Sequence, residues 1–153
     1  MRVTLHTNHA MRLLMYCALR PNEPVSIAKV AAAYNISENH LTKIAQSLAQ
    51  GGFVTTVRGR TGGVILAKRP EEINVGQVVR TTEENLDLTE CFALLTNTCV
   101  LAPECEFRQI LNKALSAFMA VLDQYTLADM VQKREPLKAL LGLGAAELKA
   151  AAQ

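Results

Sequence analysis

The fold of this chain is decided by residues 36–66, which read ISENHLTKIAQSLAQGGFVTTVRGRTGGVIL. After its first residue, Ile36, the stretch has a serine and an acidic residue. Apolar residues then recur every three or four positions up to a glycine pair. This pattern predicts a helix with a serine N-cap. Two β-rich runs, 53–57 and 64–66, follow and enclose a turn of glycines and arginines, which predicts a hairpin. A hairpin directly after such a helix is typical of the wing of a winged helix-turn-helix.

Two shorter helices are predicted before this stretch. Apolar residues at helical spacing predict the first from Thr7, taken as its N-cap, to about Leu19, just ahead of a proline. The second is predicted to start after Ser26 and to end near residues 34–35. A connection of about three residues then leads to the third helix. Two helices joined so tightly form a helix-turn-helix, whose second helix usually enters the major groove of DNA.

Charge is unevenly distributed along the 153 residues. Residues 1–70 have a balance of +7 and residues 71–153 a balance of −5, which leaves +2 overall. A basic half indicates a polyanionic partner, and nucleic acid is the natural candidate, although charge alone would also allow a chance fluctuation. We therefore expect a DNA-binding domain over 1–70, a cysteine loop and dimerisation helices over 71–141, and a flexible tail over 142–153.

The composition excludes several classes of protein. The chain is 50% hydrophobic and 20% charged, which is too apolar for a disordered chain, and no apolar run approaches the ~18 residues that span a bilayer. The apolar run 13–19 is bracketed by arginines and lacks a cleavage site, so it is a poor signal peptide. We expect a cytoplasmic protein that does not act at a membrane. No phosphate-binding loop, nucleophile triad or HExxH motif is present, so neither an enzyme nor a small-molecule substrate is expected.

Three of the four cysteines fall within fifteen residues, in the order Cys91-x7-Cys99-x5-Cys105. In a cytoplasmic chain this clustering favours metal binding or redox chemistry over a disulfide framework. A zinc site would show closer pairs with a fourth Cys or His nearby, whereas three thiolates on a loop suit an iron–sulfur cluster completed by one other group. Cys105 also opens a predicted helix, whose dipole favours a thiolate. The fourth cysteine, Cys17, is interpreted as a small core hydrophobe.

The longest periodic stretch follows the cysteines and covers residues 107–125. Apolar residues there recur in steps of three and four, which predicts a helix of roughly twenty residues with a continuous apolar seam. Because the first 70 residues offer little surface to cover this seam, we expect a second copy to cover it in a homodimer. Packing within the chain is the alternative. Shorter helices are predicted after Asn74 and Thr126 and around residues 137–141.

In these features the chain resembles the iron–sulfur winged-helix transcriptional repressors of the NsrR, RirA and IscR type, over about residues 1–141. The segments that carry the resemblance are 1–4, 7–8, 36–41, the wing at 57–63, the three clustered cysteines and 125–131. The resemblance implies a mainly α-helical fold with a small β-hairpin wing and a long dimerisation helix. It also implies a homodimer in which Cys91, Cys99 and Cys105 hold an iron–sulfur cluster, of the [4Fe-4S] type.

The resemblance leaves the fourth cluster ligand open. Proteins of the IscR type carry a histidine two residues after the last cysteine, where this chain has Phe107. Some proteins of the NsrR type supply an acidic ligand from the first helix of the other subunit, where this chain has Asn8. A neutral amide is a weak ligand, so water, a small thiol or Asn8 itself can complete the cluster. By the same resemblance, His9 and Arg12 approach the cluster across the dimer.

Two interpretations from different classes follow. In the first, the chain is a repressor that binds double-stranded operator DNA under control of the cluster, with nitric oxide as the favoured signal and iron, as in the RirA type, as the alternative. In the second, it is a small iron–sulfur carrier or redox protein, which leaves the wing and the basic half unexplained; a zinc-stabilised DNA-binding protein is a third option. The residues expected to contact DNA are Asn39, His40, Thr42, Lys43, Arg58 and Arg60.

Overall fold

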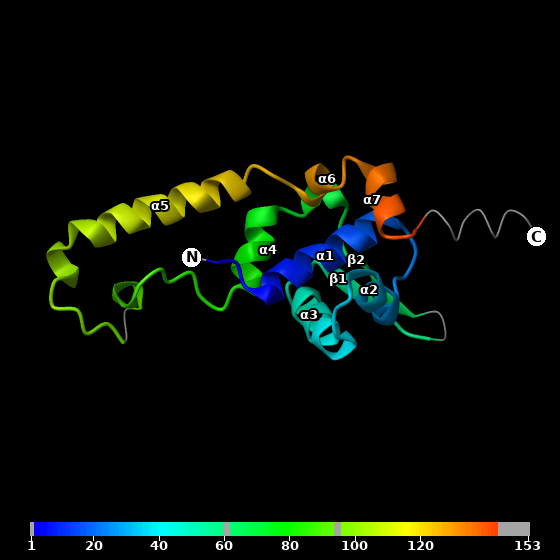
Figure 1. Ribbon diagram of the computed structural model, residues 1–153, viewed down its shortest axis with the longest axis horizontal. Coiled ribbons are helices and arrows are strands. Elements are labelled where there is room, and N and C mark those ends of the chain that lie inside the picture. The colour runs from blue at the N-terminus through cyan, green and yellow to red at the C-terminus, as the bar shows by residue number, and fades with distance from the viewer. Residues whose placement is uncertain (1, 60–61, 94–95, 144–153) are drawn as a thin grey trace, which may run out of the picture.

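The structure, a computed structural model, describes residues 2–59, 62–93 and 96–143. Over these residues it is mainly helical with one two-stranded antiparallel sheet, which confirms the expected fold class (Figure 1). Three short 3-10 turns lie at Pro70–Glu72, Glu90–Phe92 and Ala102–Glu104. The helices and strands in chain order are α1 (Leu5–Leu19), α2 (Ile27–Tyr34), α3 (Glu38–Gln50), β1 (Val54–Val57), β2 (Gly63–Leu66), α4 (Val75–Thr82), α5 (Glu106–Leu122), α6 (Leu127–Met130) and α7 (Arg134–Leu140).

Helix α1 begins earlier than the sequence predicted. Thr4, not Thr7, occupies the N-cap position, and its Oγ1 accepts a hydrogen bond from the backbone N–H of Thr7 at 3.2 Å. Thr7 is buried instead, with its hydroxyl 2.8 Å from that of Thr82 on α4. The prediction of Thr7 as the cap was wrong because both threonines can cap a helix, and only the packing of α1 on α4 distinguishes them.

The helix-turn-helix has the predicted boundaries. Helix α2 is followed by Asn35 as its C-cap, which adopts a left-handed conformation with φ 52°, and α3 begins after Ser37. Gly51 is the C-cap of α3, and Gly52 follows with φ 73°, a conformation that glycine adopts without strain. The apolar stripe of α3 is buried, as expected, on the side that contacts α1 and α2. Its residues are Leu41, Ile44, Ala45 and Leu48.

Strands β1 and β2 form the predicted wing, and residues 58–62 connect them in the sequence. Gly59 in this turn has a φ of 118°, which side-chain-bearing residues rarely adopt. Backbone hydrogen bonds of 2.8 and 2.9 Å join Val64 to Val25, so the hairpin is anchored to the segment before α2. The paired residues are Val54–Leu66, Thr55–Ile65, Thr56–Val64 and Val57–Gly63.

One hydrophobic core takes residues from both sides of residue 70. Helix α1 contacts α3, α4, α6 and β2. Residues on both sides of the predicted domain boundary at residue 70 therefore pack in the same core. The division into 1–70 and 71–141 stays a prediction about function. Leu143 is 6% exposed, so the tail predicted to be flexible from residue 142 begins with a packed side chain; residues 144–153 lie outside the described ranges. The core residues beyond residue 70 include Ile73, Val78, Leu127, Val131 and Leu143.

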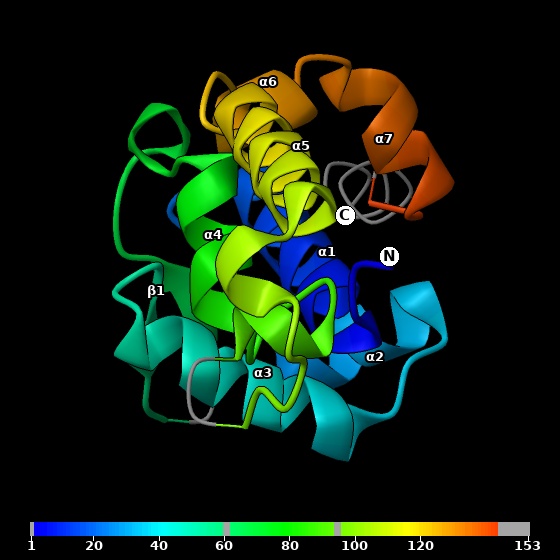
Figure 2. The same cartoon turned by 90° about the vertical axis from the view of Figure 1, so that its left-hand side faces the viewer.

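Helix α5 projects away from this core (Figure 1), and Figure 2 views the molecule nearly along its axis. It is amphipathic, as predicted, but Met119 is the only buried residue among its seventeen. Its C-terminal end is fixed to α4, because Arg80 donates two hydrogen bonds to the carboxylate of Asp123. The side-chain amide of Asn74 adds bonds to the carbonyls of Asp123 and Tyr125. Most of α5 thus stands without a packing partner in the part of the chain that the structure describes.

Candidate functional site

Helix α3 and the wing are in contact and present polar and basic side chains to solvent. Asn39 and Lys43 are exposed on the first turns of α3, and Arg58 is exposed where β1 ends. The strand β1 packs against α3, and both lie on the same side of α1 (Figure 1). Arg60, which was also expected to contact DNA, falls outside the described residues. Asn39, Lys43 and Arg58, three of the six residues predicted to contact DNA, are thus exposed on two elements that pack against each other.

Two further predicted contacts on α3 have partners within the protein. Thr42 is exposed, but its Oγ1 donates to the backbone carbonyl of Glu38 at 2.9 Å. The ring of His40 is half-buried against α1, with its centroid 5.2 Å from that of His9 and 6.1 Å from that of His6. This histidine cluster could not be predicted from the sequence pattern, because His40 is more than thirty residues from the other two. The three-residue spacing of His6 and His9 on one helix was the available signal.

One histidine of this cluster, His9, has a buried ring nitrogen. Its Nδ1 is buried and has no hydrogen-bond partner among residues 2–59, 62–93 and 96–143. Burial lowers the pKa of His9, and the nearby positive charges of His40, Arg12 and His6 lower it further. The neutral imidazole is therefore the favoured form at neutral pH. Arg12 itself is turned toward α2, with its guanidinium carbon 5.6 Å from the centre of the Tyr34 ring.

The three clustered cysteines lie in the segment between α4 and α5. Cys91 is buried, with its Sγ 3.0 Å from the hydroxyl of Thr89, and Cys99 and Cys105 are half-buried. Cys105 is the N-cap of α5, as predicted. All three are free thiols. Within the described ranges, however, the structure groups no three His, Cys, Asp or Glu side chains closely enough to hold a metal ion.

The chemistry of this donor set fits the expected iron–sulfur cluster. Three free thiols on one segment supply the soft ligands that such clusters use, and none is committed to a disulfide. Asn8, which the resemblance indicates as one possible fourth ligand, is exposed on α1. It lines an apolar groove with Met11, Arg12 and Met15, whose other wall comes from α6 and α7. Three free thiols are thus available as ligands, while Asn8 lines a groove formed with residues of α2, α6 and α7.

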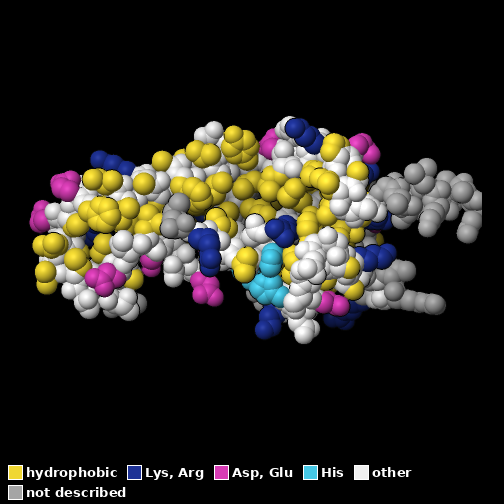
Figure 3. Space-filling model, viewed as in Figure 1, with side chains coloured by type: hydrophobic (Ala, Val, Ile, Leu, Met, Phe, Trp, Pro, Cys, Tyr) yellow, Lys and Arg dark blue, Asp and Glu magenta, His cyan; other side chains and the backbone are white. Residues whose placement is uncertain are grey.

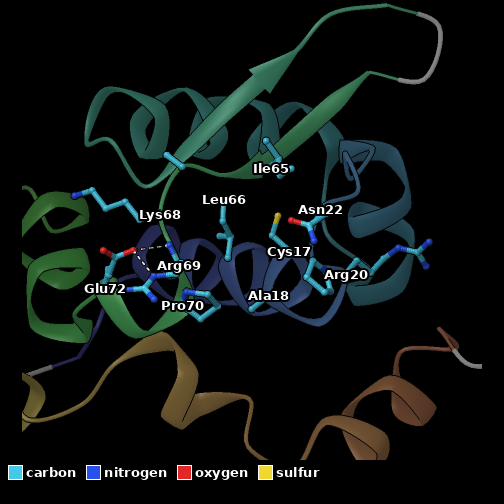
Figure 4. Close-up of a pocket in the computed structure, with 12 residues that line it drawn as sticks. Cys17, Ala18, Arg20, Asn22, Ile65, Leu66, Lys68, Arg69, Pro70 and Glu72 are labelled. Carbon is cyan, nitrogen blue, oxygen red and sulfur yellow. Dashed lines mark hydrogen bonds and ion pairs between the residues drawn. The ribbon is translucent and has the colours of Figure 1, made fainter.

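Cys17, the fourth cysteine, belongs to the core, as predicted. It is 3% exposed, and burial raises the pKa of its thiol to about 12. It borders a cavity of about 590 Å³ between α1 and β2, where Figure 4 shows it near Leu66. At the rim of the cavity, Arg69 is paired with the carboxylate of Glu72. A buried, protonated thiol is a poor nucleophile, so we assign Cys17 a packing role.

Apolar side chains remain exposed along α5, where Figure 3 shows hydrophobic surface running the length of the helix. Phe107, Ile110 and Val121 are 61%, 59% and 52% exposed. A groove of about 730 Å³ runs between α5 and residues 83–89. So much exposed apolar surface on one helix marks an interaction site. The α5 residues that line the groove are Phe107, Leu111, Ala114, Leu115 and Phe118.

Comparisons with known proteins identify a family of transcriptional regulators. None of the helices within the described residues is long and apolar enough to cross a membrane. The family model Rrf2, described as an iron-dependent transcriptional regulator, matches residues 3–133. The transcriptional regulator NsrR of Halalkalibacterium halodurans is 50% identical over 144 residues, which are 94% of this chain and 99% of that protein. NsrR of Bacillus subtilis is 45% identical over 142 residues, which are 92% and 97%.

Solved structures show the same architecture. IscR of T. potens superposes with a TM-score of 0.71 at 27% identity, over 90% of this chain and 91% of that one. A putative transcriptional regulator from Listeria innocua gives a TM-score of 0.72 at 28% identity, over 86% and 87%. The curated relatives are named as transcriptional regulators, in agreement with the sequence-based expectation that this chain is not an enzyme.

Proposed function

The chain belongs to the Rrf2 family of transcriptional regulators, and we propose that it represses transcription by binding operator DNA with an affinity that an iron–sulfur cluster controls. The observation that carries the proposal is the combination of two features in one chain. Helix α3 and the wing present Asn39, Lys43 and Arg58 to solvent, and a segment with three free thiols leads directly into the long helix α5. A repressor of this kind acts in the cytoplasm, where the operator is.

The DNA contact is proposed to follow the geometry of a winged helix. The start of α3 enters the major groove, where the Asn39 amide can pair with adenine and Lys43 contacts guanine or phosphate. Thr42, whose hydroxyl already donates within the helix, contributes through its remaining lone pairs and methyl group. Arg58, together with Arg60, inserts into the adjacent minor groove, whose negative potential favours guanidinium groups. His40 joins this set only if its ring turns away from His9.

Cys91, Cys99 and Cys105 are the residues that would hold the cluster, proposed as [4Fe-4S], with Asn8 of the other subunit, water or a small thiol as the fourth ligand. When bound, the cluster supplies iron sites that react with nitric oxide. Cys105 is the N-cap residue of α5, so a ligand bound there would stand at the N-terminus of the long helix. Because Cys105 caps α5, a change in how the three cysteines hold the cluster would be transmitted to the start of this helix.

We propose that two copies of the chain form a homodimer through α5. Helix α5 buries one residue of its own, and its exposed apolar side chains need cover that the described part of the chain does not give. A second copy of α5 has the same apolar surface and is the simplest cover. Two winged domains would then face two half-sites of a roughly two-fold symmetric operator.

The signal is proposed to be nitric oxide. The segments 37–41 and 127–129 resemble the NsrR type most closely, and the relatives with 45–50% identity quoted above carry that name. The cysteine spacing and Asn8 favour the RirA type, so iron is the second candidate. Both candidates use the same cluster and the same DNA-binding surface.

One experiment separates these candidates. The protein is purified without oxygen, its visible spectrum is recorded, and operator duplexes are selected from random-sequence DNA. Selected DNA is then titrated in gel shifts after adding nitric oxide or, separately, an iron chelator. Release by stoichiometric nitric oxide supports the proposed signal, whereas release only by the chelator supports iron. Failure to select any duplex by an iron-containing protein would instead support an iron–sulfur carrier, and bound zinc without iron would support a zinc-stabilised DNA-binding protein.

A further inference from the structure

All three histidines of the chain meet where α1 packs against α3. His6 and His9 are three residues apart on α1 and therefore share one face of the helix, while His40 lies in the first turn of α3. The plane of the His40 ring is 84° from that of His9 and 90° from that of His6. Figure 3 shows the histidines gathered in one surface patch, so the cluster is accessible to solvent.

The separation of the His9 and His40 rings, but not that of the His6 and His40 rings, equals the spacing of two imidazoles that share a metal ion. A zinc–nitrogen bond of about 2.0–2.1 Å puts the ring centre about 3.2 Å from the ion, and two rings at a tetrahedral angle then stand about 5.2 Å apart. The centroids of His9 and His40 are 5.2 Å apart. Those of His6 and His40 are 6.1 Å apart, so the nitrogens do not yet converge on one point, in keeping with the lack of a closed metal-binding group in the described ranges. Because His6 is half-buried at the edge of the cluster, rotation of its side chain can close the gap.

His9 supplies an independent reason for a ligand. A buried ring nitrogen without a hydrogen-bond partner is costly, and the Nδ1 of His9 is such an atom within the described residues. If the His9 ring turned so that its Nδ1 coordinated a metal ion, this nitrogen would gain the partner that it lacks.

Charged groups around the cluster allow a cation. His6, Glu83 and Glu84 line one cavity of about 330 Å³, so two acidic residues lie near one of the three histidines. The nearest cation on the same helix, Arg12, is turned toward the Tyr34 ring. Asn8 is two residues from His6, about 200° around the helix, so the cluster is on a different face from the groove that Asn8 lines.

We propose that His6, His9 and His40 form a second metal site, separate from the cysteine segment, for a late first-row divalent ion such as Co²⁺, Ni²⁺ or Zn²⁺. Imidazole nitrogen is a preferred ligand for these ions. The ion bridges α1 and α3 and holds His40 against α1. Where the proposed function holds, the bound ion therefore keeps His40 away from the operator.

Metal binding by the histidines can be measured without DNA. Co²⁺ is titrated into the full-length protein under anaerobic conditions, and bound ions are counted by native mass spectrometry while the absorption spectrum is recorded. Cobalt held by imidazole lacks the intense near-ultraviolet charge-transfer band of cobalt held by thiolate, so the spectrum distinguishes this site from the cysteines. We expect one ion per chain without a thiolate band, and His9→Gln and His40→Gln should each weaken its binding by at least about tenfold.

Two further variants serve as a control and as a second test of the histidine ligands. Asn39→Gln changes the neighbour of His40, leaves all imidazoles in place, and should bind Co²⁺ as the wild type does. His6→Gln alters the half-buried edge of the cluster and provides a second ligand variant should His9→Gln fail to fold, as judged by circular dichroism. Equal Co²⁺ affinity in the wild type and in folded histidine variants, or ions bound only with a thiolate band, would overturn the proposal.

A DNA measurement then tests the consequence for α3. Bound Co²⁺ should lower operator affinity of the wild type but not that of His40→Gln. Because this step rests on the proposed function and the ion count does not, the failure of one is distinguishable from the failure of the other. An operator affinity that is the same with and without Co²⁺ would show that the ion does not hold His40 away from DNA.

Discussion

Arg80 on α4 and Asp123 after α5 are joined by two hydrogen bonds of 2.6 and 2.7 Å from the guanidinium to the carboxylate. The hydrogen bonds from Arg80 hold the pKa of Asp123 below its usual value. Gly76 makes room for this pair, because a Cβ at that position would overlap the Asp123 carboxylate. The pair fixes the C-terminal end of a helix that is otherwise little covered, so it sets the direction in which α5 leaves the winged domain.

Gly76→Ala and Asp123→Asn are expected to loosen this junction. The first displaces the carboxylate and the second removes its charge, so both break the two-bond contact with Arg80. Hydrogen exchange should rise in peptides that span the junction between α4 and α5 and stay unchanged in α3. Ser116→Ala, at an exposed position of α5, is the control. Wild-type exchange at the junction in both variants would show that the pair does not hold the helix.

Arg58→Ala is expected to weaken operator binding by about 1–3 kcal/mol, because one minor-groove contact is lost from each wing. The visible spectrum of the cluster should not change, since Arg58 lies on the wing and not in the cysteine segment. Lys133→Ala removes an equal charge from an exposed position before α7 and serves as the control. Quantitative gel shifts at one fixed salt concentration provide the measurement. Normal binding by Arg58→Ala would remove the wing from the DNA interface.

Phe118→Glu is expected to disrupt the homodimer. Phe118 lines the groove along α5, and a charge buried there without a partner is costly. Light scattering should show monomers or aggregates for this variant. Ser116→Glu adds the same charge to an exposed position of the same helix and should leave the dimer intact. A monodisperse dimer of Phe118→Glu would favour packing of α5 within its own chain.

Cys99→Ala is expected to give a colourless protein, because one of three thiolate ligands is lost. The helices should remain, since the side chain of Cys99 is only half-buried. Operator affinity should fall by roughly 5–150-fold, the usual range of an allosteric coupling, while salt-dependent non-specific binding persists. Cys17→Ala, which removes the cysteine of the core, should keep the colour. Tight operator binding by colourless Cys99→Ala would show that the cluster is not the switch.

The stability of the protein should fall in alkaline solution in a way that depends on Cys17. Burial raises the pKa of this thiol from its usual value of 9.0 to about 12. As pH rises above 9 the unfolded chain loses the proton first, so the stabilisation is complete below that pH and is lost as pH approaches 12. Denaturant titrations at about pH 8 and about pH 11 should therefore show a larger loss of unfolding free energy in the wild type than in Cys17→Ala. Equal losses would contradict the assignment.

The sequence predicted the elements of the fold because their signals are local. The serine cap, the apolar stripe and the glycine pair placed α3 between residues 37 and 51, and two β-rich runs placed the wing. Where two nearby residues carried the same signal, as Thr4 and Thr7 do, the sequence could not choose between them. The cysteine cluster was visible as a spacing, but the structure does not bring its thiols together in one metal-binding group within the described residues, so their role rests on chemistry and family.

The sequence by itself determined the winged helix-turn-helix, the long amphipathic α5 and the free thiols that precede it, because helical periodicity, turn residues and ligand spacing act over a few residues. Only the tertiary structure decided that residues beyond 70 complete the core, that Arg80 and Asp123 fix α5, and that His40 meets His6 and His9. These contacts join residues more than thirty positions apart. Such contacts form only when burial of apolar surface packs the helices together, and a pattern over a few residues cannot predict that packing.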